Sequence, residues 1–474
     1  MATLEELTAT WAAANQGHVL SFAAELGEPQ LSQLLAQLRS IDPAAANAMY
    51  ARATAAPAAS GADDGGGGAV APLPDVARSC TASPEVRARW RSRGVAAVAA
   101  GKVGVLLLAG GQGTRLGFDK PKGMYNLGLP SGKTLFRLQA ERLLKLQGLA
   151  GAGAPPIPWY VMTSAATDAE TRAYFAQEGF FGLVEAQCFF FEQDTVPAFH
   201  DDGRIVLEAK HRVAVAPNGN GGLYTSLQSS GALDDMARRG VEYVPQNCVD
   251  NALVKVADPE FVGFCVERGA ECASKVIPKQ HAHEKVGVVV LRGGRPQVVE
   301  YSEIDAATAE RTDADGNLVF SASHICVNYF TAAFLRRAAA EIVSLMPLHL
   351  ARKKIPYVND AGETVTPEAP NGVKLELFIF DTFPHAATFA ALEGARAEDF
   401  APVKNAPGPG SSDSPDTARA LLGDYHRSWL VAAGATVADG APVEVDAALS
   451  YDGEGLEGFA GKHIEAGAFV VRGE

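Results

Sequence analysis

The sequence predicts an α/β protein: a Rossmann-like, doubly wound mixed sheet with a helical N-terminal region and a small β-rich C-terminal domain. From about residue 102 to 399, short apolar runs alternate with amphipathic helical patterns, which is typical of a doubly wound sheet. The apolar run from Val103 to Leu108 ends abruptly in glycines, as a buried strand does when it leads to a ligand. The chain is also large enough for a substantial core, because 47% of its 474 residues are hydrophobic.

The first 95 residues are expected to form the helical N-terminal region. Pro29 stands near a helix start and is followed by apolar residues at helical spacing: Leu31, Leu34, Leu35 and Leu38. Residues 54–74 are instead rich in Ala, Gly, Pro and Asp. Such a segment cannot bury enough surface to offset the entropy of ordering it. We therefore expect a flexible connection over 54–74.

Residues 96–400 are expected to form the main domain, and residues 401–474 the small C-terminal domain. In the main domain, a helix that starts at about Thr134 should cover the sheet with one apolar face, made of Phe136, Ala140, Leu143 and Leu144. The Pro- and Gly-rich stretch 407–415 predicts a surface loop. After one more helix, the strand-like stretches 442–445 and 468–471 indicate the β-rich C-terminal part.

The glycine-rich loop after the first strand carries the strongest functional signal. From Leu106 to Gly123 it reads LLLAGGQGTRLGFDKPKG. Its glycines let the backbone approach a ligand closely and present bare N–H groups. Three cations then follow closely: Arg115, Lys120 and Lys122. A turn with solvated cations would account for each feature separately, whereas a phosphate-binding loop accounts for all of them together.

This loop matches neither of two common phosphate-binding motifs. A dinucleotide fingerprint has the spacing G-x-G-x-x-G, but Gly111, Gly113 and Gly117 follow G-x-G-x-x-x-G. A Walker A loop has four residues between its first Gly and its Gly-Lys-Thr, whereas three separate Gly128 from Gly132. We therefore expect the loop to bind a nucleotide phosphate in a third way.

Charge and hydropathy exclude other classes of protein. The net charge of −14 argues against a nucleic-acid surface, and no apolar run reaches the 18 residues of a membrane span. The acidic N-terminus lacks the apolar segment of a signal peptide, so a cytoplasmic protein is expected. The six cysteines include no C-x-x-C pair, and Cys265 and Cys272 are interpreted as buried apolar residues.

Several long stretches resemble one family, the eukaryotic UDP-N-acetylglucosamine pyrophosphorylases, which are UDP-N-acetylhexosamine uridylyltransferases. The first is the glycine-rich loop, continued as LLLAGGQGTRLGFDKPKGMYNLGLPSGKTLF. The others follow in the expected order: APNGNGGLY (216–224), CVDNALVKVADPEFVGF (248–264), VVEYSEI (298–304), KKIPYV (353–358), NGVKLELFIFD (371–381), FAPVKNA (400–406) and SYDGEGLE (450–457). The resemblance covers most of residues 95 to 460.

The resemblance implies a nucleotide-sugar pyrophosphorylase fold and an enzyme that joins UTP to N-acetylglucosamine 1-phosphate, with UDP-N-acetylglucosamine and pyrophosphate as products. The nucleophile is a phosphate oxygen that is largely ionised at pH 7, so no general base is needed. In-line displacement at the α-phosphorus instead needs positioning, Arg and Lys side chains, and Mg²⁺, for which Mn²⁺ can substitute. The expected partners are these small molecules, without nucleic acid or membrane; a homodimer is an assembly to be tested.

The family's phosphate-binding positions carry over to the glycine-rich loop. Gly110 and Gly111 should cradle the nucleotide, with Leu108 beside the base. Arg115 looks like the pyrophosphate clamp, because the guanidinium fork matches two phosphate oxygens. Lys122 should lie at the α-phosphate.

The uracil and sugar positions fall on two later motifs. Gln193 resembles the uracil reader, since an amide both donates and accepts toward a pyrimidine edge. In the turn from Gly219 to Gly222, Asn220 should hold the sugar and the backbone of Gly222 should approach the uracil. Without the resemblance, this GNGG segment would be interpreted as a tight turn.

The remaining implied residues are charged. Asp250 looks like the Mg²⁺ ligand, because hard cations prefer carboxylate oxygen. Glu300 resembles the acceptor for sugar hydroxyls, with Glu303 as the alternative on the same segment. Lys374 and Lys404 resemble the cations that meet the phosphates from the far side of the substrate.

The sequence departs from the family pattern in two motifs. The usual Asp before GNGG is Asn218 here, which removes one negative charge. The usual Asn-x-x-x-His becomes His324-Ile-Cys-Val-Asn328, and in the family that Asn faces the sugar. His324 is therefore the expected sugar-facing residue, and the sugar range stays open: N-acetylgalactosamine 1-phosphate or glucose 1-phosphate is the alternative substrate. A non-catalytic nucleotide-sugar-binding protein is a third interpretation, against which the retained cations and Asp250 weigh.

Overall fold

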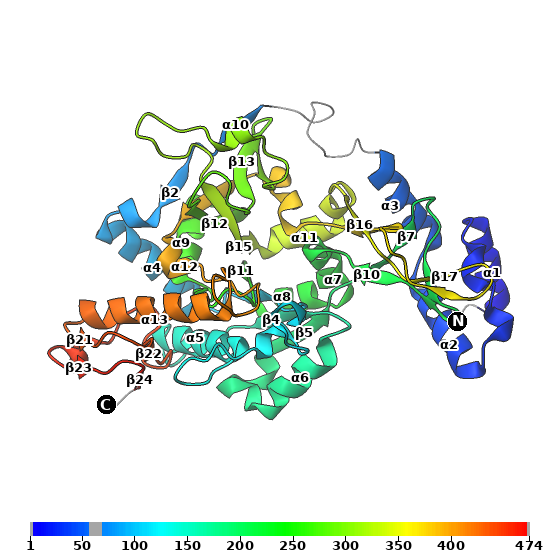
Figure 1. Ribbon diagram of the computed structural model, residues 1–474. Helices are drawn as coiled ribbons and strands as arrows, with labels where there is room; N and C mark the ends of the chain where they lie inside the picture. Colours follow the sequence, from blue (N-terminus) through cyan, green and yellow to red (C-terminus); the bar gives the residue numbers. More distant parts are fainter. Residues whose placement is uncertain (1–2, 56–68, 472–474) are drawn as a thin grey trace. The chain divides into compact units, whose positions relative to one another are not determined.

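The computed structural model describes residues 3–55 and 69–471 and confirms the mixed α/β class (Figure 1). The described residues divide into two compact units, each made of three stretches of chain. The smaller unit takes its residues from 1–67, 193–225 and 342–382, and the larger unit from 68–192, 226–341 and 383–474. These units interleave along the chain, whereas the sequence suggested consecutive regions with boundaries at 95 and 400; those boundaries stay predictions.

The larger unit is built on a mixed sheet. Its main strands lie in the order β2 (Val76–Arg78), β20 (Phe389–Glu393), β12 (Cys272–Pro278), β15 (Ala322–Thr331), β11 (Tyr243–Cys248), β3 (Val105–Leu108), β4 (Trp159–Thr163) and β5 (Cys188–Glu192). β15 runs antiparallel to β11 and β12, and the other neighbours in this order are parallel. Beyond this order, β13 (Val288–Arg292) pairs with β1 (Val70–Pro72), β14 (Arg295–Val299) and β15.

Helices pack on both faces of this sheet, as a doubly wound arrangement requires. Successive residues of a strand point to opposite faces. Trp159 and Val161 of β4 lie in the core that includes α5 (Leu135–Leu149), while the Tyr160 hydroxyl donates a 2.9 Å hydrogen bond to Asp235 of α8 (Ala232–Arg239). The predicted helix at Thr134 is confirmed as α5, which Thr134 caps. The other helices are α4 (Pro84–Ala99), α6 (Asp168–Gln177), α9 (Pro259–Arg268), α10 (Ala306–Ala309), α11 (Ala332–Ala340), α12 (Arg396–Asp399) and α13 (Pro415–Ala432), with α7 (Leu223–Ser229) across the unit boundary.

The predicted β-rich C-terminal part is confirmed. After α13, β21 (Thr436–Val437) pairs with β23 (His463–Ile464), and β22 (Glu444–Val445) pairs with β24 (Phe469–Val470). Lys133, at the start of α5, forms ion pairs with Glu141 at 2.6 Å and with Asp446 at 3.3 Å. This lysine is therefore engaged in structural contacts, consistent with the exclusion of a Walker A loop.

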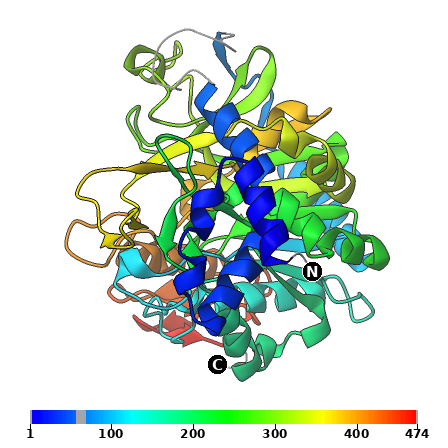
Figure 2. The ribbon, with the colours of Figure 1, turned by 90° about the vertical axis from the view of Figure 1, so that its right-hand side faces the viewer.

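The smaller unit packs the N-terminal helices against short strands (Figures 1 and 2, dark blue helices). The helices are α1 (Leu4–Ala13), α2 (Glu28–Ser40) and α3 (Pro43–Ala55). The strands are β6 (Thr195–Pro197), β7 (Phe199–His200), β8 (Leu207–Ala209), β9 (Arg212–Val213), β10 (Val215–Pro217), β16 (His349–Lys353), β17 (Tyr357–Val358), β18 (Thr364–Val365) and β19 (Gly372–Glu376). Trp11 and Leu34 share a core with Phe199 and Leu375, and the Gln16 amide donates to Gly203 O at 3.0 Å. Helices and strands far apart in sequence thus form one body.

The segment predicted to be flexible, 54–74, falls mainly on residues 56–68, which lie outside the described residues. The prediction does not hold at its described ends. Residues 54–55 finish α3, and Val70–Pro72 form β1, paired with β13. The prediction rested on the average composition of the whole segment and therefore missed the short strand β1 near its end.

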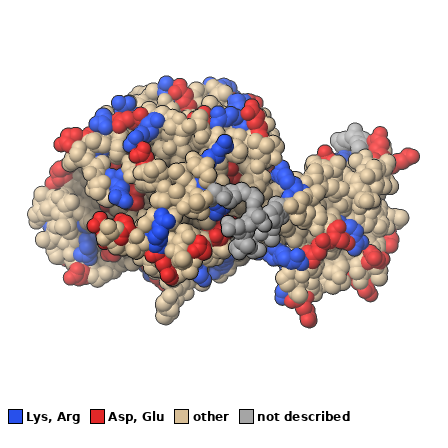
Figure 3. Space-filling model, turned by 90° about the horizontal axis from the view of Figure 1, so that it is seen from above, with Lys and Arg blue, Asp and Glu red and all other residues tan. Residues whose placement is uncertain are grey.

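On the face of the molecule in Figure 3, basic and acidic side chains are interspersed. No helix in the described ranges is long and apolar enough to cross a membrane.

A buried ion network in the larger unit joins β12 to the start of α9 and the end of α12. The Lys275 ammonium bonds Asp258 at 2.8 Å and also bonds Asp399, and the side chains of all three are at most 9% exposed. Burial alone would raise the pKa of Asp258, but Lys275 and Lys255 outweigh it and hold that pKa below its ordinary value. The stabilisation from this carboxylate is therefore present above its ordinary pKa of about 4 and is lost as the pH falls.

Replacing Lys275 by Met is expected to lower the free energy of unfolding by about 3–5 kcal/mol, because two buried carboxylates lose their cation. Without Lys275, burial should raise the pKa of Asp258, so protonation of that carboxyl should shrink the deficit as the pH falls toward about 4. Urea unfolding at pH 7 and pH 4 measures both effects. Lys102→Met is the control, because Lys102 pairs with Glu242 at the surface and its loss should change stability little. An equal deficit at both pH values would contradict the account.

Candidate functional site

The glycine-rich loop leaves the sheet at the carboxyl end of β3, directly beside the end of β11. Leu108 pairs with Cys248 in the parallel register, and Val249 N donates to Leu108 O at 3.0 Å. Ser164, which follows the next parallel strand, donates its hydroxyl to Gly110 O at 2.8 Å. A Cβ on Gly111 would meet no atom within 4 Å. The loop is thus anchored at Gly110 and open at Gly111, as a backbone that receives a ligand must be.

Lys122 and Asp250 meet where the loop folds back. Lys122 N donates to Gly111 O at 3.0 Å, and the Lys122 ammonium lies 3.6 Å from Asp250 Oδ2. Both side chains are partly exposed, at 17% and 23%. Val403 N donates to Asp250 O at 2.9 Å, which brings the exposed residue Lys404 next to the same strand end. The structure therefore brings Gly111, Lys122, Asp250 and Lys404 together.

Asn251 fixes the backbone of the segment that leads to Lys404. Its amide Nδ2 donates to Asp399 O at 2.7 Å, and its Oδ1 accepts from Ala401 N at 2.9 Å. Because Asp399 also bonds Lys275, the buried ion network fixes the segment that leads to Lys404. Sequence reasoning missed this support, although the polar run after an apolar strand (CVDN) was a signal for it.

Arg115 stands apart from these contacts. It lies in the single turn Thr114–Leu116, is exposed, and forms no ion pair or side-chain hydrogen bond within the described part of the chain. The neighbouring cation Lys120 is engaged with Glu170 at 3.8 Å. Arg115 is thus a cation of this loop that can turn toward a phosphate without breaking a contact to the described residues.

Glu300 and His324 lie at one edge of the sheet. His324 N donates to Gly287 O at 2.9 Å, and a Cβ on Gly287 would come within 3.2 Å of Glu300 Oε1. β15 runs antiparallel to β11, so its amino end, with His324, reaches the same sheet edge as Asp250. The structure thus brings the two predicted sugar residues of this unit together.

His324 and Asn328, which exchange places relative to the family pattern, are hydrogen-bonded to each other. His324 Nε2 lies 3.1 Å from Asn328 Oδ1, and Asn328 Nδ2 donates to Gln246 Oε1 at 2.7 Å. Since the Asn328 amide nitrogen faces Gln246, its oxygen accepts from His324, whose Nε2 therefore carries the proton. Burial lowers the pKa of His324 to about 4, so the imidazole is neutral near pH 7. Asn328 is fully buried, whereas His324 is partly exposed.

In the smaller unit, the GNGG turn is joined to the chain that follows β19. Gly219 has a φ of 65°, and a Cβ there would lie 2.2 Å from Leu377 O. Gly221 N donates to Leu377 O at 2.8 Å, and Asn220 Oδ1 accepts from Ile379 N at 2.9 Å. Only glycine fits at 219, because positive φ and close backbone contact coincide.

Gln193 and Lys374 belong to this second cluster. The Gln193 amide donates to Gly219 O, and Lys374 lies on β19, three residues before Leu377. Gly222 packs closely against Asn218, since a Cβ atom on Gly222 would come within 2.9 Å of the Asn218 Cβ. The smaller unit therefore brings together Gln193, Gly219, Asn220, Gly222 and the strand of Lys374.

Asn218 is buried, and its Oδ1 has no hydrogen-bond partner in the described part of the chain. Phe378 and Phe380 flank Ile379 in the sequence, and Ile379 N is the group that donates to Asn220; the two rings lie 5.2 Å apart. Sequence reasoning missed this aromatic pair, although the alternation of apolar and aromatic residues in LFIFD could have indicated it.

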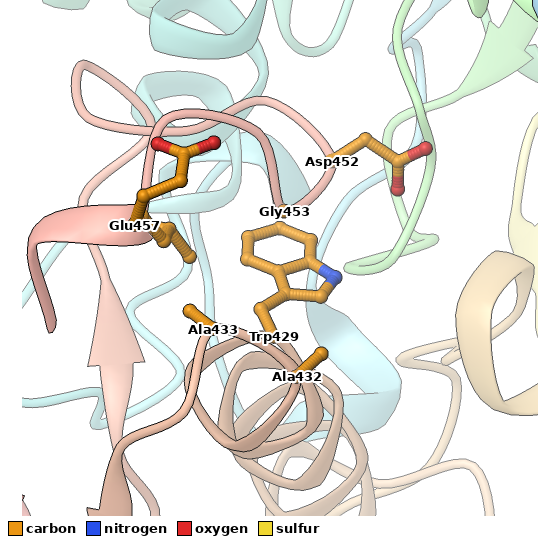
Figure 4. A pocket seen from close by; sticks show the side chains of 7 residues that line it. Trp429, Ala432, Ala433, Asp452, Gly453 and Glu457 are labelled. Atoms are coloured by element: carbon orange, nitrogen blue, oxygen red, sulfur yellow. The ribbon is translucent and has the colours of Figure 1, made fainter. Parts of the chain in front are cut away.

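A pocket of about 320 Å³ lies elsewhere, between the end of α13 and the loop that follows β22 (Figure 4). Trp429 forms its floor, with Asp452 and Glu457 at its sides. No predicted site residue lines it.

Comparisons with known proteins show which family the chain resembles. Residues 87–414 match the family model for UTP–glucose-1-phosphate uridylyltransferase. UDP-N-acetylhexosamine pyrophosphorylase-like protein 1 of Homo sapiens is 45% identical over 481 residues, covering 96% of this chain and 95% of the human one. The UDP-N-acetylglucosamine pyrophosphorylase of Saccharomyces cerevisiae is 44% identical over 386 residues, 81% of this chain and 80% of the yeast one.

Solved structures show the same relationship. The UDP-N-acetylglucosamine pyrophosphorylase of Trypanosoma brucei, in complex with an inhibitor, has a TM-score of 0.83 at 30% identity and covers 97% of this chain and 95% of its own. A mutant UDP-glucose pyrophosphorylase of Leishmania major shares the fold, with a TM-score of 0.60 at 18% identity and coverage of 94% and 87%. A family model matches residues 87–414, and a relative is 45% identical over 96% of this chain, so the protein belongs to the UTP–glucose-1-phosphate uridylyltransferase family.

Proposed function

We propose that this protein is a UDP-N-acetylglucosamine pyrophosphorylase, which forms UDP-N-acetylglucosamine and pyrophosphate from UTP and N-acetylglucosamine 1-phosphate. The observation that carries the proposal is the cluster of Lys122, Asp250 and Lys404 beside the open backbone of Gly111, at the carboxyl ends of parallel strands. Ligands of open α/β sheets bind at that edge. The names of the relatives supply the substrate class.

The chain's residues contribute charge and position to the proposed reaction. A phosphate oxygen of the sugar phosphate attacks the α-phosphorus of UTP, and pyrophosphate leaves in line. Lys122 stabilises the charge at the α-phosphate, Arg115 holds the leaving pyrophosphate, and Lys374 and Lys404 offset the charge of the two substrates. In the smaller unit, Gln193 and the backbone of Gly222 bind the uracil, while Asn220 binds the sugar.

Asp250 fits the proposed Mg²⁺. No group of three or more acidic, His or Cys side chains in the described residues could hold a metal by itself. Mg²⁺ is commonly bound through one or two carboxylates together with substrate phosphates and waters, and Asp250 supplies one carboxylate. When bound, the ion would offset negative charge on the nucleotide phosphates.

Pyrophosphate release from UTP, measured across a panel of sugar 1-phosphates with and without Mg²⁺, tests the function. N-acetylglucosamine 1-phosphate should be preferred to glucose 1-phosphate by about tenfold or more, since a site built to bind the acetamido group leaves polar atoms unpaired without it. Binding of UDP-N-acetylglucosamine without pyrophosphate release would favour the non-catalytic alternative. A broader hexosamine range is the second candidate, because His324 replaces the family's sugar-facing Asn.

Exchanging the two polar residues, as His324→Asn with Asn328→His, is expected to change the ratio of kcat/KM for N-acetylglucosamine 1-phosphate over N-acetylgalactosamine 1-phosphate by about tenfold. The reason is that His324 is the partly exposed member of the pair, while Asn328 only orients it. In the natural chain the ratio should be constant from about pH 6 to pH 8, because the imidazole is already neutral there. An unchanged ratio in the double variant would show that the pair is purely structural.

A further inference from the structure

Cys248 and Cys326 are neighbours at the sheet edge that carries Asp250 and His324. β11 and β15 pair as far as Gln246 opposite Asn328, and Cys248 and Cys326 each lie two residues beyond that pair, on adjacent strand ends. Gln246 Nε2, on the same face of β11 as Cys248, lies 3.9 Å from Cys326 Sγ, and the neighbouring Cys326 thiol, together with burial, raises the pKa of the Cys248 thiol. Strand pairing and side-chain contacts therefore both bring the two cysteines together.

The backbone at Cys326 is unusual. Its φ is 55°, in the left-handed region that residues with a side chain seldom adopt. The residue lies where the register between β15 and β12 shifts, because Val327 pairs with Lys275 but His324 pairs with Val276. Such bulges re-aim side chains and are common beside active sites. Here the bulge accompanies the contact between the two thiols.

We propose that Cys248 and Cys326 form a redox-modification site, a dithiol that closes to an intrachain disulfide and lowers the uridylyltransferase activity. Neighbouring strands of a sheet lie about 4.7–4.9 Å apart, which lets Cα atoms on adjacent strand ends come within the range of about 4.4–6.8 Å found for disulfides. Both residues are partly exposed, so a small oxidant can reach them, whereas Cys265 and Cys272 are buried. The effect on activity rests on the proposed function; the disulfide itself does not.

The oxidant is a low-molecular-weight disulfide such as oxidised glutathione. The thiolate of Cys326 attacks it first, because the pKa of the Cys248 thiol lies well above its ordinary value, and the attack forms a mixed disulfide and releases one glutathione thiolate. The thiolate of the second cysteine then attacks the protein sulfur of that mixed disulfide and releases the second glutathione. The two protein thiols lose two electrons and two protons in total, and the oxidised glutathione becomes two molecules of reduced glutathione.

Closure would disturb the site through the backbone. A disulfide needs its sulfurs about 2.0 Å apart, closer than two thiols in non-bonded contact, so at least one strand end must shift. Asp250 follows Cys248 by two residues, and His324 precedes Cys326 by two. Misplacing a reacting group by about 1 Å can lower a rate about 100-fold.

The experiment incubates the full chain with oxidised glutathione, blocks free thiols and identifies peptides joined through Cys248 and Cys326 by mass spectrometry. Pyrophosphate release is measured before and after treatment with dithiothreitol. We expect the joined peptide and a loss of activity of at least about tenfold, both reversed by the reductant. Peptide mapping gives its answer even if the reduced protein has no uridylyltransferase activity, so a failure of the proposed function is distinguishable.

Matched variants separate this site from other thiols. Cys326→Gly suits the positive φ and should keep its activity in oxidised glutathione, and Cys326→Ser should behave alike. Cys80→Ser removes an exposed cysteine and should stay as sensitive as the natural chain. The proposal is overturned if no joined peptide forms, if only glutathione adducts are found, or if Cys326→Gly and Cys326→Ser lose activity as the natural chain does.

Discussion

Replacing Asp250 by Asn is expected to lower turnover about 100- to 1,000-fold while the protein stays folded. One preorganised electrostatic partner is typically worth about 2.7–4 kcal/mol in the transition state, and Asn keeps the shape of Asp but not its charge. The fold should survive because the contact that joins Asp250 to Val403 uses its backbone oxygen. Steady-state kinetics over a range of Mg²⁺ concentrations, with thermal unfolding, measure both effects.

Two comparisons sharpen this test. Asp439→Asn removes a fully exposed carboxylate and should leave turnover unchanged. Combining Asp250→Asn with Lys122→Met should cost less than the sum of the single losses, because the two side chains lie 3.6 Å apart and act on one substrate group. Turnover of Asp250→Asn within twofold of the natural chain at limiting Mg²⁺ would exclude the proposed role.

Features coded by local pattern could be predicted from the sequence. The spacing of Phe136, Ala140 and Leu143 indicated α5, and the run from Val103 indicated β3, because one buried face or one buried strand leaves a periodic signature. The same logic placed the glycine-rich loop at a strand end. The interleaving of the two units could not be found in this way, since it depends on distant contacts such as that between Gln16 and Gly203.

The candidate site, too, could be predicted from the sequence only in part. Lys122 and Asp250 follow strands whose ends are adjacent, and the family resemblance points to both residues, which the structure places within 3.6 Å of each other. The hydrogen bond between His324 and Asn328, and the closeness of Cys248 to Cys326, depend on the direction of β15 and on its bulge. A single sequence carries no local sign that this strand runs antiparallel. Likewise, the sequence does not distinguish the buried Lys275 from a surface lysine, because its partners Asp258 and Asp399 are distant in the sequence.

Arg115→Ala is expected to lower turnover about 100-fold or more, because one preorganised charged partner is worth about 2.7–4 kcal/mol in the transition state. The affinity for UDP-N-acetylglucosamine should change less than about twofold, since the proposed partner of Arg115 is the leaving pyrophosphate, formed from the β- and γ-phosphates of UTP, which is not part of this product. Loss of an interaction with the leaving pyrophosphate lowers turnover but leaves the affinity for UDP-N-acetylglucosamine unchanged. Calorimetry with UDP-N-acetylglucosamine and kinetics in both directions measure the two quantities, and in the reverse reaction the KM for pyrophosphate should rise.

Lys120→Ala provides the matched control, because Lys120 is an exposed cation of the same loop that is engaged with Glu170. If the loop acted through its general positive charge, both variants would lose activity alike. If Arg115 acts as a bidentate clamp, Arg115→Lys should recover only part of the loss, since an ammonium cannot match two phosphate oxygens at once. Equal losses of product affinity and turnover in Arg115→Ala would instead assign this residue to the uridine monophosphate part of the nucleotide. The Mg²⁺ dependence argued for Asp250 would stand in either case, because it concerns a different contact.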